Sequence, residues 1–422
     1  MAADDEARAS EAPSGDDEGR RLSLLRVALA VASAVTLLYT EPLWRFHDLP
    51  PQFPPFALAP PAWLDLPMFF VAIAALGMLI VGGRAVPAAA FTFVGAMLLL
   101  LLGDQHRWHS EIQMFVLFAA GVGVVSLIPA HRGIVLALLR LYVVSTYAYS
   151  GLQKLNPSFV HEVAPWLTQP ALSWGGLTPQ TLGDPAWIAI GVSMALLEAS
   201  LAILLTLPRT RTAGVILAVA MHAFVLLMIG PLGRHWNEVV WPWNAFMIVA
   251  VPVLFWRTPG HWLVPLRARP LAIAAAVAIA LFPTGYALGL IDAYPAHNLY
   301  SGYPGVATTC VPRDAPIADE AWRSHIPSRM RTIDGRPWVC VDELGWYLEA
   351  VRIPPYLAPR VQAGLAVALC DDVHPPDVAL LESPRAPLLR FARTAPRPPD
   401  IYRGCDAIRA HANAGWLRGS PR

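Results

Sequence analysis

Apolar runs of about twenty residues recur along this 422-residue chain as far as residue 291, and they constrain its fold more than any other feature. A helix needs about twenty mainly apolar residues to cross the hydrocarbon of a bilayer. Hydrophobic residues make up 55% of the chain and charged residues only 14%, which soluble globular proteins do not show. The sequence therefore predicts an all-α, multi-pass integral membrane bundle, with the lipid bilayer as a partner.

Nine spans are expected, separated by polar or proline-containing loops. They cover Leu22–Tyr39, Leu64–Gly82, Ala85–Gly103, Glu111–Pro129, Gly133–Leu152, Pro185–Leu207, Thr212–Gly230, Val240–Trp256 and Leu271–Ile291. Residues 1–20 are acidic and poor in apolar side chains, so we expect a disordered tail. Residues 21–291 then form the membrane domain, and residues 292–422 form a small separate domain.

The C-terminal domain is rich in proline and arginine but still has apolar stretches. Three of them, Trp338–Val341, Trp346–Val351 and Leu365–Cys370, are short enough to be strands. We therefore expect some β structure in this domain.

The distribution of basic residues predicts the orientation in the membrane, because cytoplasmic loops collect arginine and lysine. With the N-terminus inside, nine basic residues lie at cytoplasmic ends and four in the short opposite loops. The nine are Arg20, Arg21, Arg84, Arg132, Arg209, Arg211, Arg257, Arg267 and Arg269, and the four are Arg45, Arg107, Lys154 and Arg234. An odd number of spans then places the C-terminal domain outside the cytoplasm of a cell-membrane protein.

All four cysteines, Cys310, Cys340, Cys370 and Cys405, lie in the C-terminal domain. An even number confined to one extracytoplasmic domain predicts two disulfides, with three possible connectivities. The alternative is four unpaired thiols. The wide spacing argues against a zinc site, and we expect no metal. No basic tract indicates a nucleic-acid partner.

Lys154 is the only lysine in the chain, and it lies where the fifth span meets a polar segment. Arg140, Tyr147, Gly151 and Lys154 are spaced by seven, four and three residues, so they share one helix face. One interpretation is an interfacial anchor whose charge suits the C-terminal end of a helix. The other is a catalytic base, which needs burial that makes the neutral amine accessible.

Three further ionisable residues, Arg140, Glu198 and His222, fall inside predicted spans at similar depth. Charged groups inside hydrocarbon are costly and need partners. Because consecutive antiparallel helices tend to be neighbours, we expect Arg140 to pair with Glu198. These groups either fix helix register or form the floor of a polar cavity.

Polar residues also gather in the loops on the side of Lys154. Asp104–His109 precedes the fourth span, with Glu111 just beyond, and Arg234–Glu238 precedes the eighth. Tryptophans there are typical of an interfacial belt, but the density of polar groups also predicts an outward-facing pocket. The candidates from these loops are Arg107, His109, His235, Asn237, Glu238, Trp243 and Asn244.

The segment YAYSGLQKLNPSF, from Tyr147 to Phe159, resembles the Y-x-x-x-G-x-x-K-L segment of the horizontally transferred transmembrane (HTTM) domain. This membrane domain is shared with vitamin K-dependent gamma-carboxylases. Residues 104–107, 208–211 and 237–244, with Glu198 and His222, look like further landmarks, and the likeness covers about residues 20–290.

The resemblance implies that Lys154 is the base that deprotonates a reduced quinone of the vitamin K type. That reaction starts carboxylation of glutamate in an exported peptide. We place the catalytic group at Lys154, His109 and His235, with His131 as another candidate for the family's histidine. Substrate binding is placed on the shared face of the fifth span, at Tyr147 and Gly151, and on the other polar loop residues.

Two functions from different classes stay open. The first is a carboxylase-like membrane enzyme that modifies an exported peptide or protein. The second is a non-catalytic scaffold, or a partner in maturation or export, whose C-terminal domain binds a secreted protein. A polar cavity that reaches Lys154 favours the enzyme, and a solidly packed interior favours the scaffold.

Overall fold

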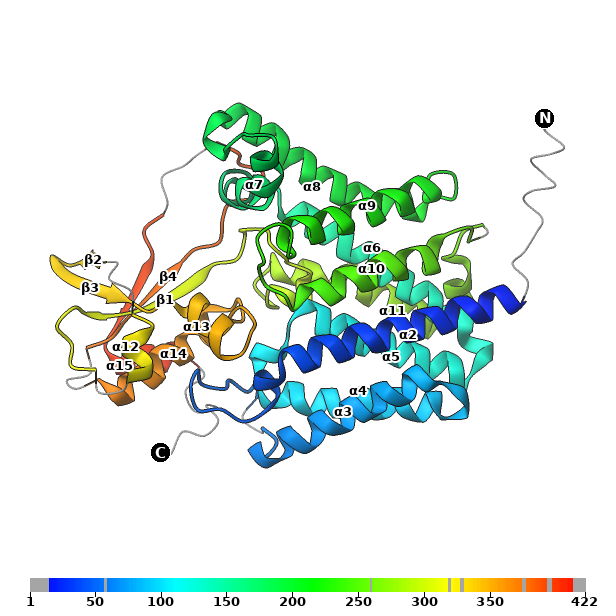
Figure 1. Ribbon diagram of the computed structural model, residues 1–422, viewed down its shortest axis with the longest axis horizontal. Coiled ribbons are helices and arrows are strands. Elements are labelled where there is room, and N and C mark those ends of the chain that lie inside the picture. The colour runs from blue at the N-terminus through cyan, green and yellow to red at the C-terminus, as the bar shows by residue number, and fades with distance from the viewer. Residues whose placement is uncertain are drawn as a thin grey trace.

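The computed structural model describes residues 15–56, 59–258, 260–317, 320–326, 330–373, 377–392 and 397–412. Within these residues a bundle of α-helices is followed by a smaller domain with a sheet, which lies at one end of the bundle (Figure 1). Most of the predicted disordered tail, residues 1–14, lies outside the described residues. The prediction is wrong for residues 15–20, which already belong to helix α2.

Ten α-helices in the described residues make up the bundle. Their bounds are α2 Gly15–Tyr39, α3 Asp65–Val81, α4 Val86–Gly103, α5 Ser110–Leu127, α6 Arg132–Gln153, α7 Ala164–Trp174, α8 Asp184–Thr206, α9 Arg211–Ile229, α10 Val240–Phe255 and α11 Pro270–Leu281. A π-helical turn, Phe159–Val163, leads into α7. The C-terminal domain docks at the end of the bundle formed by Gly103, Ser110 and Gln153, which we call the domain end.

Seven helices of the described residues are long and apolar enough to cross a membrane, and they indicate a membrane protein. They correspond to the first seven predicted spans. The other two predicted spans appear as the shorter apolar helices Val240–Phe255 and Pro270–Tyr286. Helix α10 nevertheless runs the length of the bundle, because Trp256 at its far end accepts a hydrogen bond of 2.7 Å from Arg21.

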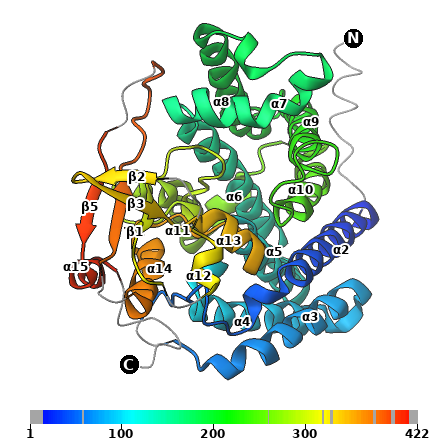
Figure 2. The same ribbon diagram turned by 60° about the vertical axis from the view of Figure 1, so that its left-hand side comes forward.

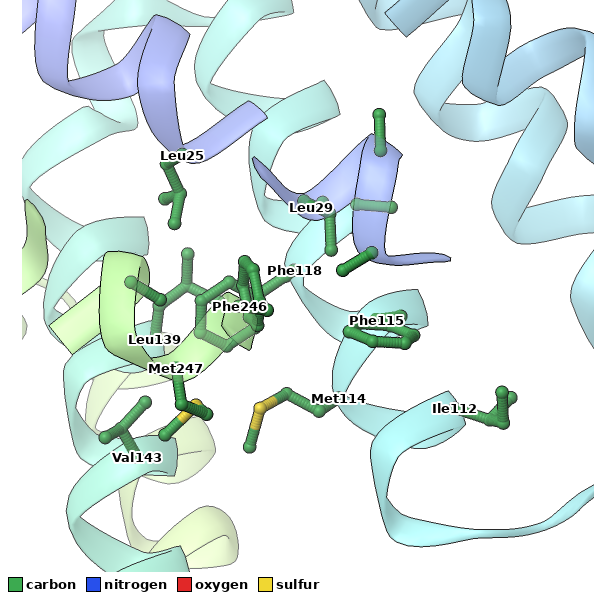
Figure 3. Packing of buried hydrophobic residues seen from close by; sticks show 14 of the residues in the cluster. Leu25, Leu29, Ile112, Met114, Phe115, Phe118, Leu139, Val143, Phe246 and Met247 are labelled. Carbon is green, nitrogen blue, oxygen red and sulfur yellow. The ribbon is translucent and has the colours of Figure 1, made fainter. Parts of the chain in front are cut away.

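The core of the bundle forms where α2, α5, α6 and α10 meet (Figure 3). Phe246 of α10 packs edge-to-face against Phe118 and Phe115 of α5, with ring centroids 5.3 and 5.7 Å apart. Leu25 and Leu29 of α2 are fully buried in the same cluster. Since these side chains carry no polar atoms, this part of the bundle is a packed interior.

The C-terminal domain contains a five-stranded antiparallel sheet in the order β2-β3-β1-β4-β5. Its elements are β1 Val306–Pro312, α12 Glu320–Ser324, β2 Met330–Ile333, β3 Arg336–Cys340, α13 Glu343–Ala350, α14 Pro359–Asp372, β4 Ala379–Ser383, β5 Asp400–Arg403 and α15 Cys405–His411. The predicted β structure is therefore present, as the strand at Trp338 shows.

Two of the three predicted strand stretches are wrong, because they are helical. Trp346–Val351 falls largely in α13, whose N-terminus is capped by Asp342 through a hydrogen bond of 3.1 Å from Gly345 N. Leu365–Cys370 falls in α14, which begins at Pro359, a residue favoured in the first turn of a helix. In both stretches the signals for the start of a helix, Asp342 and Pro359, determined the structure more strongly than the short apolar runs did.

All four cysteines are paired, as Cys310–Cys340 and Cys370–Cys405. The first disulfide joins directly opposed residues of β1 and β3. The second joins α14 to the start of α15. The two predicted disulfides are thus present, and one of the three connectivities that the sequence left open is selected.

His106, in the turn between α4 and α5, joins the two domains. The Tyr356 backbone N–H donates to its Nδ1 at 3.2 Å, so Nε2 carries the proton and donates to the Tyr347 hydroxyl at 3.0 Å. Burial lowers the pKa of His106 to about 4, which keeps the ring neutral at physiological pH. Both ring nitrogens therefore fix the C-terminal domain against the bundle.

Candidate functional site

A cavity of about 1100 Å³ lies between the domain end of the bundle and the C-terminal domain, which covers that end in Figure 2. Its volume is near the upper limit of small-molecule sites, so it suits a ligand of several residues. The bundle contributes His109, Glu111, Trp166, Trp236 and Asn237. The segment before β1 contributes Tyr294, Asn298 and Tyr300, and the C-terminal domain contributes Leu344, Arg385, Arg390 and Arg397.

His109 and Glu111 form an acid–base pair at the start of α5. His109 Nδ1 lies 3.5 Å from Glu111 Oε1, and the His109 ring stacks on Tyr294 with centroids 4.4 Å apart. Ser110, between them, donates to the Tyr294 carbonyl at 2.8 Å, which holds this turn of the helix in place. Burial lowers the pKa of His109 to about 3, while the Pro354 carbonyl raises it slightly. The imidazole is therefore neutral.

Several polar atoms on the cavity wall are buried and have no hydrogen-bond partner on another described residue. They are His109 Nε2, both carboxylate oxygens of Glu111, His161 Nδ1, Asn237 Oδ1 and Asn298 Nδ2. Buried polar groups in proteins are nearly always hydrogen-bonded, so a cluster of exceptions at one cavity needs an explanation. Because these atoms line the cavity, water or a ligand inside it can form the missing hydrogen bonds.

The opposite wall of the cavity is basic. Arg385 lies over the Tyr286 ring, 4.1 Å from its centroid, and donates to the Tyr286 carbonyl. Arg390 and Arg397 are exposed and form no ion pair with any residue that the structure describes. The bundle side therefore contributes the acidic side chains Glu111 and Glu162, whereas the C-terminal domain contributes arginines.

Lys154 does not line this cavity. Its Nζ lies 2.8 Å from Glu198 Oε2 and donates to Ser150 Oγ at 2.7 Å and to the Ser150 carbonyl at 3.3 Å. The Lys154 side chain is only 10% exposed and that of Glu198 only 16%. The amine is thus buried, and its contacts are with Glu198 and Ser150.

The predicted pairing of Arg140 with Glu198 is wrong. Glu198 pairs with Lys154, whereas Arg140 Nε donates to the Leu254 carbonyl of α10 at 2.6 Å. A Cβ on Gly151 would lie 2.4 Å from Ala199 N, so the end of α6 crosses α8 at the level of Glu198. The prediction compared positions counted from the end of each helix, and it did not include the shift of α6 relative to α8 along the bundle.

Tyr147 and His222 form a second polar group inside the bundle, together with Asn244. Asn244 Nδ2 donates to the Val240 carbonyl, so its Oδ1 accepts from His222 Nδ1 at 2.8 Å. His222 Nε2 then accepts from the Tyr147 hydroxyl at 2.8 Å. This chain links α6, α9 and α10, and Trp243 packs edge-on to His222.

The structure places Arg107, His235 and Glu238 away from the cavity. The Arg107 guanidinium donates to the Leu43 and Leu100 carbonyls and pairs with Asp65 at 2.9 Å, so it ties helices together. His235 is 65% exposed and pairs with Glu238 on the surface, at 2.7 Å.

The predicted candidates therefore fall into separate groups. Of the predicted catalytic and substrate-binding residues, only His109 and Asn237 line the cavity. Tyr147, Gly151 and Lys154 share one face of α6, as predicted, but that face packs on α8 and α9.

Sequence reasoning missed the segment from Tyr294 to Gly302 and the arginines of the C-terminal domain. The only signal was a polar and aromatic run, HNLYSGY, directly after the last apolar stretch. Among the residues that the structure describes, no group of three or more His, Cys, Asp or Glu side chains could hold a metal ion.

Comparison of the chain with protein-family models, curated proteins and solved structures found no match.

Proposed function

We propose that this chain is a multi-pass membrane enzyme that binds an exported peptide or protein segment in the cavity and catalyses a covalent, mass-changing modification of it, with His109 as the general base. One observation carries the proposal. His109 lines the cavity, its imidazole is buried and neutral, and its Nε2 has no hydrogen-bond partner on another described residue. Glu111 next to Nδ1 would orient the ring and stabilise the imidazolium formed when Nε2 takes a proton. The 3.5 Å separation is longer than a hydrogen bond, and catalytic contacts of this kind often shorten only when substrate binds.

The proposed enzyme has nine spans, an inner N-terminus and an outer C-terminal domain. Besides the seven membrane-length helices, α10 reaches from Asn237 at the cavity to Trp256 beside Arg21. Helix α11 packs along α6, where Tyr149 donates to the Ala280 carbonyl at 2.8 Å. Two disulfides in the C-terminal domain support an oxidising compartment for that domain.

The reduced quinone implied by the HTTM resemblance does not fit this arrangement. The amine that would take its proton, Lys154 Nζ, does not line the cavity, and it contacts Glu198 and Ser150 instead. The aromatic wall at Trp166 and Tyr300 would accept a flat ring, but it brings no such base to it. We derive no step through a quinone.

One observation favours a non-catalytic scaffold as the second candidate. The polar groups inside the bundle, from Lys154 to Asn244, satisfy one another and fix helix contacts. A scaffold would use the cavity only to hold a partner for export or maturation.

The proposal is tested on the peptides and proteins that the native cell exports. Intact masses are compared between cells with the unaltered gene, a deletion, and the variants His109→Gln and His235→Gln. We expect one exported species to change mass in the deletion and in His109→Gln. The mass of that species should be the same in His235→Gln as in cells with the unaltered gene. His235 is a matched control, because it lies on the same side of the bundle but does not line the cavity.

Export that fails in the deletion, with no change of mass in any exported species, would exclude the enzyme and support the scaffold. If His235→Gln alone reproduces the deletion, the active site is not in the cavity.

The role of Lys154 has its own test in the same assay. Lys154→Arg keeps a positive charge, but a guanidinium has essentially no neutral form at pH 7. If Lys154 only stabilises the bundle, a Lys154→Arg variant that inserts normally retains the modification. Loss of modification by this inserted variant would restore Lys154 as a base.

A further inference from the structure

We propose that the bundle wall of the cavity is a binding site for a primary ammonium group of the peptide substrate, recognised by Glu111 and Asn237. This inference rests on the proposed function and names the chemistry by which that site recognises its substrate.

Glu111 is the first observation. It is 1% exposed, lines the cavity, and neither carboxylate oxygen bonds to another described residue. The one basic side chain beside it, His109 at 3.5 Å, is neutral because burial lowers its pKa to about 3. A carboxylate buried without a counter-charge is costly, so a cation in the cavity would remove a penalty already present in the protein.

Asn237 supplies a second acceptor with no partner. Its Nδ2 donates to the Tyr300 hydroxyl at 2.6 Å, which leaves Oδ1 buried and unbonded. The cavity therefore offers acceptors in the carboxyl group of Glu111, an amide oxygen and a neutral imidazole, and an unbonded donor in Asn298 Nδ2. A primary ammonium has three N–H donors for the acceptors, and a peptide carbonyl oxygen can accept from Asn298.

The aromatic side chains of the wall suit the same group. The Tyr300 and Trp166 rings lie nearly parallel, at 14° with centroids 6.3 Å apart, and both residues line the cavity. Aromatic faces attract cations, most strongly where water is excluded. The Trp166 ring already holds one cation in this way, since the Arg234 guanidinium carbon lies 4.5 Å from its centroid.

The basic wall decides how the rest of the ligand is placed. Arg385, Arg390 and Arg397 repel a cation and attract carbonyl and carboxylate oxygens. A ligand with an ammonium at one end and oxygens along its length fits both walls, which describes a peptide that enters amine first. Because the basic wall belongs to the C-terminal domain, beyond the membrane-length helices, a peptide suits the cavity better than a lipid headgroup does.

The test uses the full chain in phosphatidylcholine nanodiscs and two probes, trialanine amide and N-acetyl-trialanine amide. Calorimetric titration should give a Kd for the free amine at least about tenfold lower than for the acetylated peptide, equivalent to about 1.4 kcal/mol. Glu111→Gln should remove that difference. Glu162→Gln, which changes an exposed acidic residue of the same cavity, should preserve it.

Equal affinity of the unaltered protein for the two probes, or binding of neither probe, overturns the ammonium site. This comparison does not need the Glu111→Gln variant, so it remains valid if that variant fails to fold. Displacement of the free-amine peptide by phosphatidylethanolamine, but not by phosphatidylcholine, assigns the ammonium to a lipid and overturns the peptide as its source. The export mass assay fails or succeeds independently of these titrations, so the proposed function and this inference are tested apart.

Discussion

The Lys154–Glu198 ion pair should be one of the strongest single contacts between α6 and α8. Both side chains are mostly buried, and the Nζ–Oε2 distance is 2.8 Å. Removing one partner of a buried pair strands the other charge, which typically costs ~3–5 kcal/mol. Lys154→Met and Glu198→Gln should each destabilise the bundle by about that amount. The double variant should lose much less than their sum, with a coupling energy of about 2 kcal/mol or more.

The assay is reversible unfolding of the protein in mixed micelles, followed by helical circular dichroism. Arg45 and Glu41 supply the control, because this pair is exposed and lies in one turn of a 3-10 segment. Its double-mutant cycle should give less than about 1 kcal/mol. Additive losses at Lys154 and Glu198, within the error of the exposed control pair, would refute the argument that this contact joins the two helices.

Three further outcomes are expected. Gly151→Ala places a Cβ 2.4 Å from Ala199 N, so α6 and α8 must separate. We expect the free energy of unfolding to fall by about 1–3 kcal/mol in the same assay. Gly77→Ala, with open space around it, is the control and should leave the stability unchanged. The pKa of His106 is lowered in the folded protein, so domain docking is fully stable above about pH 6.5 and weakens as the pH falls toward about 4. Limited proteolysis of the domain junction should therefore become faster as the pH falls over that range. The increase should be smaller in His106→Gln. Reduction of both disulfides should cost the C-terminal domain about 2–5 kcal/mol and leave the bundle folded, as seen by domain-specific hydrogen exchange.

Periodicity and composition were sufficient to predict features that lie within a single helix. The run lengths located the apolar helices, and the spacing of Tyr147, Gly151 and Lys154 correctly placed them on one face of α6. The partner of Glu198 was not predictable from spacing, because the relative shift of α6 and α8 is set by the close contact at Gly151. A sequence shows the depth of a residue within its own helix, but the offset between two helices depends on packing.

The cavity was beyond prediction for a related reason. His109 and Asn237 could be singled out as polar residues at helix ends, but the wall that faces them comes from the C-terminal domain. Nothing in the chain between them indicates that Arg385 and Glu111 line the same cavity. That juxtaposition depends on how His106 seats between Tyr347 and Tyr356, which is a tertiary contact.

The shared wall of the cavity has a consequence for biogenesis. His109 is synthesised early and Arg385 near the end, so a ribosome must complete nearly the whole chain before the two can face each other. A nascent or truncated protein that stops before β4 can insert its helices, yet it contains no enclosed site. The cavity therefore does not exist while the helices are being made, and it forms only when the last-made domain has folded onto the first-made helices.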